Sequence, residues 1–112
     1  LGDNGMLIAI DQDEDAIKVA SERLSVYGDK VKIVRNNFSN LTDVCRELGV
    51  QKIDGLLLDI GVSSYQINES SRGFSYMADA PLDMRMDRRS ELSAWNVVNE
   101  YSEQELKRII YE

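Results

Sequence analysis

The feature that most constrains the fold is an uninterrupted apolar run that ends in a carboxylate. Leu56, Leu57 and Leu58 lead directly into Asp59, and a glycine turn follows at Gly61. A run without a polar face is typical of a strand buried on both sides, as in a parallel α/β sheet. Ligands of such sheets bind outside the carboxyl ends of the strands. We therefore expect a strand over residues 52–61 and interpret Asp59 as a candidate site residue at its end.

Two further apolar segments precede this run at the spacing of β–α–β units. The pattern predicts strands over residues 6–10 and 31–37, each short and rich in aliphatic side chains. Between them, residues 13–15 supply a helix cap and acidic first-turn residues, and apolar residues then recur at helical spacing. A short helix is expected over residues 41–50. Alternating strands and helices of this kind indicate an α/β fold with a parallel sheet.

The C-terminal half follows a different pattern. Residues 62–90 show little periodicity, so we predict irregular structure there. From Glu91 onward the pattern becomes helical, and Ser102 with Glu105 forms the signature of a capping box. Leu106, Ile109 and Ile110 give the helix after that box an apolar face.

Charge and composition exclude several classes of protein. The net charge of −7 argues against a surface that coats nucleic acid generally, although residues 72–89 hold four arginines against three aspartates. The chain has no histidine and one cysteine, Cys45, so we expect no zinc site and no internal disulfide. No apolar run approaches the ~20 residues of a membrane span. The chain starts without a signal-peptide pattern, and a cytoplasmic protein without membrane contact fits these observations.

Side chains able to bind a ligand recur where the predicted strands end. Asp11 follows the first strand, Asn37 and Phe38 follow the second, and Asp59 follows the third. A carboxylate such as Asp11 can accept hydrogen bonds from both hydroxyls of a ribose, or it can merely help to cap the next helix. An aromatic side chain such as Phe38 can face a purine ring or pack in the core. The convergence of three strand ends carries more weight than any single residue.

Asp11 and its neighbours also permit two other interpretations. Asp11 and Asp13 match the D-x-D motif of phosphoaspartyl phosphatases of the haloacid-dehalogenase type, but Asp15 stands where that motif requires threonine or valine. Acidic residues also fall at the first, third, fifth and twelfth positions of a calcium loop. Ala16 replaces the glycine that the sharp turn of such a loop needs, and a strand rather than a helix precedes it.

The segment from Arg72 to Asp87, RGFSYMADAPLDMRMD, mixes arginines, aspartates, methionines and aromatics, and Pro81 interrupts regular structure. Such a loop beside a cleft is a candidate substrate clamp or lid. Together with the preceding DGLLLDIGVSSYQINESS, it closely resembles the signature block of the RsmH/MraW family. The similarity continues through IAIDQDEDAI, NNFSNL and SAWNVVNEYSEQELKRIIYE, so it covers essentially the whole chain.

The resemblance implies an S-adenosylmethionine-dependent methyltransferase that modifies the exocyclic amino nitrogen (N4) of a cytosine in bacterial small-subunit ribosomal RNA. It also implies a class I, Rossmann-like parallel sheet. Residues 1–90 would form part of the methyltransferase core, without its first strand and glycine-rich loop, and residues 91–112 would begin a helical insertion. The chain is therefore expected to be a piece of a longer enzyme. Tyr65 stands where the family usually has proline.

The resemblance implies the cofactor contacts, and the positions of other residues suggest roles in catalysis and RNA binding. The family's cofactor contacts correspond to Asp11, Phe38, Asp59 and Gln66. Asp59 is our leading candidate for the group that accepts hydrogen bonds and the proton from the cytosine amino group, and it can instead only position the cofactor. Asp83 and Asp87 are second-rank candidates for that acceptor. We expect four arginines to meet RNA phosphates, namely Arg72, Arg85, Arg88 and Arg89.

The expected partner is ribosomal RNA or the 30S subunit, and the oligomeric state is left open. The alternatives to a methyltransferase are the phosphoaspartyl phosphatase and a non-catalytic fragment that only binds a nucleotide. The sequence contains no G-x-G-x-x-G motif, so nothing in it supports a NAD-binding half.

Overall fold

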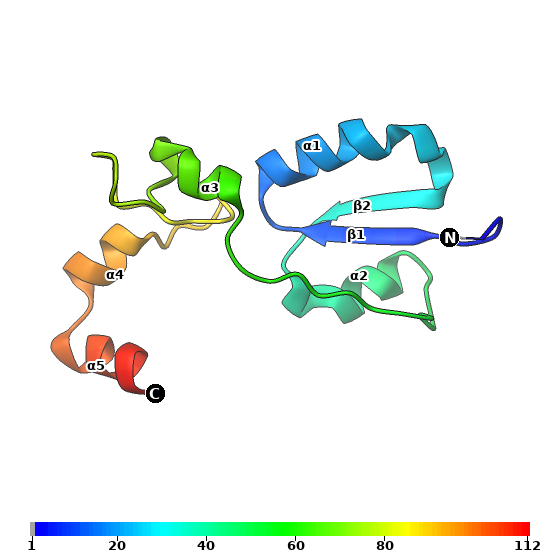
Figure 1. Ribbon diagram of the computed structural model, residues 1–112. Helices are drawn as coiled ribbons and strands as arrows, with labels where there is room; N and C mark the ends of the chain where they lie inside the picture. The colour runs from blue at the N-terminus through cyan, green and yellow to red at the C-terminus, as the bar shows by residue number, and fades with distance from the viewer. Residues whose placement is uncertain (1) are drawn as a thin grey trace. The chain divides into compact units, whose positions relative to one another are not determined.

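The computed structural model describes residues 2–112. Contacts within the chain divide it into two compact units, the first ending at Leu57 and the second running from Leu58 to Glu112. Each unit has its own secondary structure, which Figure 1 labels along the chain.

The first unit is built on two parallel strands, β1 (Leu7–Asp11) and β2 (Val31–Arg35). Their register runs from Leu7 opposite Val31 to Asp11 opposite Arg35. Because the strands are parallel and in this register, their carboxyl ends lie at the same edge of the sheet. The predicted α/β architecture with a parallel sheet is confirmed.

Helices lie on both sides of these strands. The helix α1 (Glu14–Leu24) follows β1 and contacts β2, and the 3-10 turn η1 (Ser25–Lys30) returns the chain to the sheet. After β2 come the 3-10 turn η2 (Phe38–Asn40) and the helix α2 (Leu41–Glu47), which lies across the strands from α1 (Figure 1). Val44 of α2 is only 1% exposed and is the most deeply buried hydrophobic side chain of the described residues.

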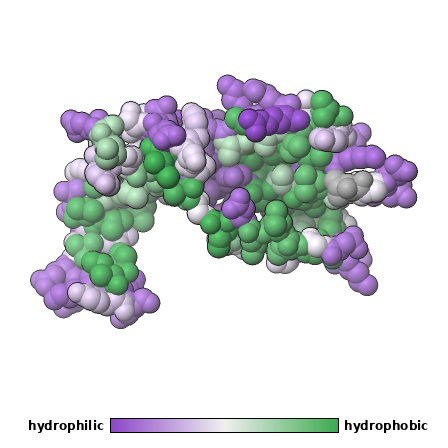
Figure 2. All heavy atoms as spheres, in the orientation of Figure 1, coloured by the Kyte–Doolittle hydropathy of each residue, from purple (hydrophilic) through white to green (hydrophobic). Residues whose placement is uncertain are grey.

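The predicted third strand does not form. Residues 52–60 are assigned to no strand, and all of them are exposed, with Leu57 at 90%. A strand needs a neighbour that satisfies its backbone hydrogen bonds, and among the described residues nothing pairs with this segment. The apolar run indicates a tendency to be buried, but it does not indicate whether a neighbouring strand is present to pair with it. Hydrophobic side chains consequently remain at the molecular surface (green in Figure 2).

The second unit consists of short helices joined by long connections. They are α3 (Ser64–Asn68), the 3-10 turn η3 (Ser70–Arg72), α4 (Ala94–Glu100) and α5 (Glu103–Tyr111). The capping box predicted for Ser102 and Glu105 is confirmed at the start of α5. The prediction of irregular structure over residues 62–90 was wrong where α3 and η3 lie. These elements are too short to show an apolar period, and local hydrogen bonds define them.

None of the helices in the described part of the chain is long and apolar enough to cross a membrane. Cys45 is a free cysteine and is partly buried in α2.

Candidate functional site

The shared carboxyl edge of β1 and β2 places Asp11 at the surface of the first unit. Its carbonyl oxygen accepts a hydrogen bond from Asn36 N–H at 2.9 Å, which continues the ladder one residue beyond the strand. Its carboxylate Oδ1 accepts from Asp13 N–H at 2.8 Å. Within the described residues no donor occupies Oδ2, and the residue is exposed. Asp11 is thus oriented by its own turn and keeps an oxygen available for a ligand.

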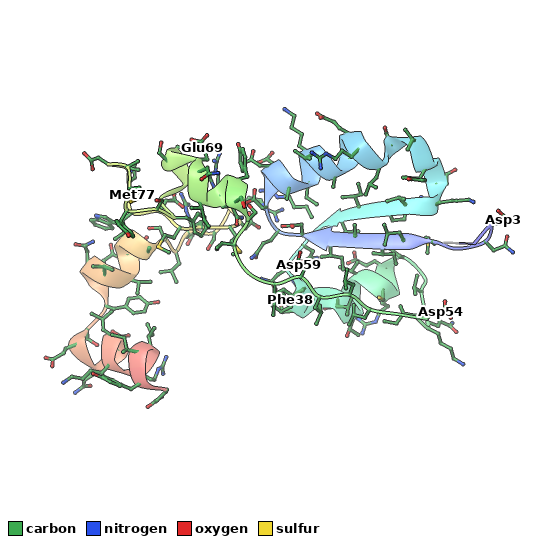
Figure 3. All side chains as sticks on the ribbon, viewed as in Figure 1. Asp3, Phe38, Asp54, Asp59, Glu69 and Met77 are labelled. Carbon is green, nitrogen blue, oxygen red and sulfur yellow. The ribbon has the colours of Figure 1, made fainter. Side chains whose placement is uncertain are left out.

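Amide side chains tie the two strand ends together. Asn37 donates from Nδ2 to Gln12 Oε1 at 3.0 Å, and its own Oδ1 accepts from Ser39 N–H at 2.9 Å. These bonds fix the turn that carries Phe38, whose side chain is 57% exposed (Figure 3). Of the predicted cofactor contacts, Asp11 is the last residue of β1 and Phe38 lies on the turn after β2, so both lie at the carboxyl ends of paired strands. The bridging role of Gln12 was missed, because a single amide after a strand is not a recognisable sequence signal.

Asp13, the second carboxylate of the D-x-D pattern, is only 3% exposed and is the N-cap of α1. Its Oδ1 accepts from Asp15 N–H at 3.0 Å. This placement favours the capping role of Asp13 over a role as an acid catalyst. Among the residues that the structure describes, no group of three or more histidine, cysteine or acidic side chains could hold a metal ion.

The second unit carries Asp59 before the helix α3 and Gln66 within its first turn. Asp59 is exposed and lies on the extended segment before Gly61, whose φ of 145° favours glycine. Ser63 and Gln66 then form a capping box at the start of α3, with Ser63 N–H donating to Gln66 Oε1 at 2.9 Å. Gln66 is 5% exposed. The side-chain oxygen Oε1 of Gln66 therefore stabilises the start of α3, in addition to any contact with a ligand.

Arg72 lies in the interior of the second unit and is only 1% exposed. It donates from Nη2 to the carbonyl oxygens of Arg85 and Met86 at 3.0 and 3.2 Å. Its guanidinium carbon lies 5.9 Å from the centre of the Phe74 ring, within range of a cation–π interaction. Met84 N–H donates back to the Arg72 carbonyl at 3.0 Å. We call this set of bonds between Arg72 and residues 84–86 the Arg72 frame.

Two arginines of this region pair with the second-rank carboxylates. Arg85 binds Asp83 with a shortest distance of 2.6 Å, and Arg89 binds Asp87 at 2.7 Å. The hydrogen bond from Arg85 holds the pKa of the Asp83 carboxyl below its ordinary value, with partial burial acting in the opposite direction. A lowered pKa makes a weaker base, so this pairing disfavours Asp83 as a proton acceptor.

The frame also fixes backbone geometry that the sequence did not reveal. Met84 has a φ of 59°, a left-handed conformation that is uncommon outside glycine. The carbonyl oxygens of Leu82 and Asp83 accept from Trp95 N–H and Ala94 N–H, each at 2.8 Å. Residues 82–84 therefore cap the start of α4 as well as closing on Arg72.

Comparison with known proteins identifies the family. The model of the MraW methylase family matches residues 1–112. The chain belongs to the MraW methylase family. The predicted family resemblance is thereby confirmed, and the α/β unit is consistent with the Rossmann-like fold expected of this MraW family member.

Several curated relatives of this MraW family member are each named ribosomal RNA small subunit methyltransferase H. The protein from Finegoldia magna is 56% identical over 108 residues, which cover 96% of the chain and 35% of the relative. The protein from Clostridioides difficile is 57% identical over 110 residues, with coverages of 98% and 35%. That from Lachnospira eligens is 59% identical over 106 residues, with coverages of 95% and 34%. The chain thus spans about a third of the length of these relatives.

Proposed function

We propose that this chain contributes the cofactor-binding edge and part of the RNA-binding surface of an S-adenosylmethionine-dependent methyltransferase. Its substrate would be the exocyclic amino nitrogen (N4) of a cytosine in small-subunit ribosomal RNA, in the cytoplasm. The observation that carries the proposal is the position of Asp11 and Phe38 at the shared carboxyl edge of β1 and β2, in a chain of the MraW methylase family. The names of the relatives support an RNA substrate.

Asp11 and Phe38 suit the nucleoside half of such a cofactor. The exposed carboxylate of Asp11 has Oδ2 available to accept from a ribose hydroxyl, and charge-assisted bonds of this kind are strong. The half-exposed ring of Phe38 offers an apolar face to an adenine. The two turns that follow β1 and β2 are already joined by the hydrogen bond from Asn37 to Gln12. Little reorganisation would then accompany binding.

The cofactor supplies an electrophilic methyl group, and the protein must hold the acceptor nitrogen in line with it. Orientation alone can contribute roughly 7–11 kcal/mol in well-placed systems. The cytosine amino nitrogen is a weak nucleophile, because its lone pair is delocalised into the ring. Asp59 would accept a hydrogen bond from the amino group and receive its proton as the nitrogen becomes positive. The exposure of Asp59 leaves it accessible for this role.

The arginines would act on the RNA backbone. Arg88 and Arg89 lie on the exposed part of the segment after the Arg72 frame, with the Arg89 side chain 59% exposed. Arg85 is held by Asp83 and by the carbonyl oxygen of Ser90 at 2.7 Å. We propose that Arg88 and Arg89 make the main phosphate contacts, with Arg85 and Arg72 setting the segment's shape. The target base would leave its stack to reach the methyl group.

The test uses the complete protein, labelled S-adenosylmethionine and unmodified 30S subunits. We expect label in the small-subunit RNA, and nucleoside digestion should place the methyl group on cytosine N4. Methyl groups on a ring carbon or a ribose would contradict the proposed acceptor. In parallel, Asp11→Ala should abolish calorimetric binding of S-adenosylhomocysteine, with NAD as a decoy that neither protein binds. Equal cofactor affinity in Asp11→Ala would remove Asp11 from the cofactor site.

A further inference from the structure

A loop with fastened ends carries two strongly exposed hydrophobic side chains in the second unit. We call residues 74–80 the Tyr76 loop. Gly73, just before the loop, has a φ of 71°, and a Cβ there would lie 2.4 Å from the carbonyl oxygen of Pro81, just after it. The backbones at the two ends therefore meet with no side chain between them. Loops closed in this way are frequently functional.

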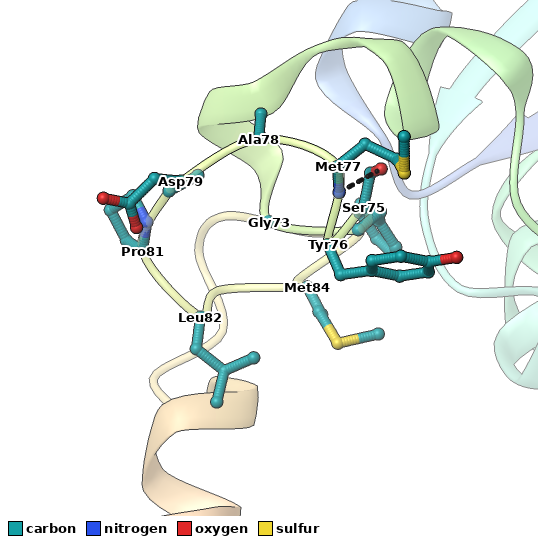
Figure 4. Close-up of a pocket in the computed structure, with 11 residues that line it drawn as sticks. Gly73, Ser75, Tyr76, Met77, Ala78, Asp79, Pro81, Leu82 and Met84 are labelled. Carbon is teal, nitrogen blue, oxygen red and sulfur yellow. Dashed lines mark hydrogen bonds between the residues drawn. The ribbon is translucent and has the colours of Figure 1, made fainter.

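The Tyr76 loop surrounds a hollow. The hollow has a volume of about 500 Å³ and is lined by residues of the loop and of its two ends (Figure 4). Within the loop, Met77 N–H donates to the side-chain hydroxyl oxygen Oγ of Ser75 at 3.2 Å. Tyr76 is 96% exposed and Met77 is 81% exposed. The fastening at Gly73, together with the Arg72 frame, therefore sets the loop's shape.

The two exposed side chains lie on one side of the loop, and its only charged side chain, Asp79, lies on the other. Figure 4 shows Tyr76 and Met77 on the side opposite Asp79 and Pro81. A phenol ring is flat, a thioether is polarisable, and neither carries a charge. A ligand on the side of Tyr76 and Met77 would therefore be held by stacking and not by an ion pair.

Charge and size indicate which ligand this surface fits. The chain leaves the loop through the Arg72 frame, which includes Arg85, and then reaches Arg88 and Arg89. A nucleotide combines a flat base for a tyrosine with a phosphate for an arginine. A protein partner would need roughly 800 Å² of surface on this side, much more than two side chains provide. Single-stranded RNA matches both features.

We propose that Tyr76 is a stacking platform for one unpaired base of the RNA substrate, with Met77 extending its surface. This inference rests on the proposed function and adds a base-binding subsite to it. Stacking of a base on an aromatic residue tolerates different bases, because each has a π face. Tyr76 therefore contributes to RNA affinity and to the placement of the target strand.

The first experiment measures RNA affinity of the complete protein over a series of salt concentrations, by filter binding. The probe is a small-subunit RNA oligonucleotide that contains the target cytosine. Tyr76→Ala should weaken binding by about 5- to 150-fold, while the slope of affinity against salt stays unchanged, since stacking releases no counterions. Tyr76→Phe should bind like the wild type. Tyr27→Ala is the matched control, because Tyr27 is an exposed tyrosine of the other unit.

A second experiment identifies the base by replacing single nucleotides with abasic ones. At one position the abasic substitution should weaken RNA binding to the wild type. The same substitution should not weaken RNA binding to Tyr76→Ala any further. Additive losses at every position, or normal affinity of Tyr76→Ala, would overturn the inference. In those cases a wild type that still methylates 30S subunits leaves the proposed function standing. A wild type that transfers no methyl group to RNA would overturn both.

Discussion

Arg72 donates from Nη2 to the carbonyl oxygen of Arg85 at 3.0 Å, so one predicted RNA-binding arginine holds the backbone of another. The same nitrogen also contacts the carbonyl oxygen of Met86 at 3.2 Å. A guanidinium that is 1% exposed cannot reach a phosphate without leaving these bonds. Arg72 therefore shapes the segment, and the exposed Arg88 and Arg89 are the arginines that we propose for the phosphate contacts.

Replacing Arg72 should therefore destabilise the fold without removing a phosphate contact. Arg72→Ala leaves two carbonyl oxygens without their donor, and we expect a loss of about 3 kcal/mol in the free energy of unfolding. RNA affinity should fall, but its salt slope should stay constant. Arg88→Ala is the matched control, for which the slope should decrease by about 1 with little change in stability. Urea unfolding and salt-dependent RNA binding of the complete protein measure both quantities. A smaller slope in Arg72→Ala would instead indicate a direct phosphate contact.

Two glycines with nearly equal φ should respond differently to alanine. Gly73 and Gly49 have φ values of 71° and 70°, but only Gly73 has backbone atoms where a Cβ would stand. Gly49→Ala should cost about 1–2 kcal/mol, from the left-handed conformation alone. Gly73→Ala adds a clash with Pro81 and should cost clearly more. Thermal unfolding of the two variants tests this difference, and equal losses would show that the Tyr76 loop is not closed as described.

The sequence predicted the first unit well, because its signals are local. The apolar runs of β1 and β2, and the cap of α1 at Asp13, appear in the structure within a residue or two of their predicted positions. The strand expected around Leu57 failed for a non-local reason. Its formation depends on a neighbouring strand, and no residue within the run reports whether that neighbour is present.

The arginine-rich segment shows a second limit of sequence reasoning. Four arginines close together indicate a phosphate-binding surface, but their spacing does not reveal which one is buried. The burial of Arg72 depends on the return of the chain through residues 84–86, which is fixed by the closed turn at Gly73 and by the left-handed Met84. These are backbone features of a loop without regular structure, and they have no periodic signature.

The pairing of Asp83 with Arg85 should make stability depend on pH in the acid range. The pKa of Asp83 is lowered in the folded protein, first by the hydrogen bond from Arg85. The pair therefore contributes fully above the unfolded pKa of about 3.9 and is lost as pH falls through the lower folded value. Asp83→Asn should unfold more easily than the wild type above about pH 4, and the two should converge below it. Urea unfolding between pH 3 and 7 measures this, and a constant difference would exclude the linkage.

Substitutions of the buried N-cap Asp13 test its capping role. They also distinguish a methyltransferase from the phosphatase suggested by the D-x-D pattern. Asp13→Ala removes the acceptor for Asp15 N–H and should cost about 0.5–2 kcal/mol, whereas Asp13→Asn should retain much of the cap. Methyl transfer by either variant should be close to normal at a temperature where both are folded. Magnesium-dependent hydrolysis of a phosphate ester that disappears in Asp13→Asn would favour the phosphatase instead.

Asp59 should act on the chemical step more than on cofactor affinity. If its carboxylate receives the amino proton, Asp59→Asn should lower the single-turnover rate by about 10²- to 10⁴-fold. The Kd for S-adenosylhomocysteine should change much less, because the amide keeps the shape of the side chain. Asp54→Asn is the matched control, an exposed carboxylate on the same segment that should leave rate and affinity unchanged (Figure 3). A rise in Kd with a near-normal rate at saturating cofactor would instead assign Asp59 to holding the cofactor, and the proton acceptor would have to be sought elsewhere.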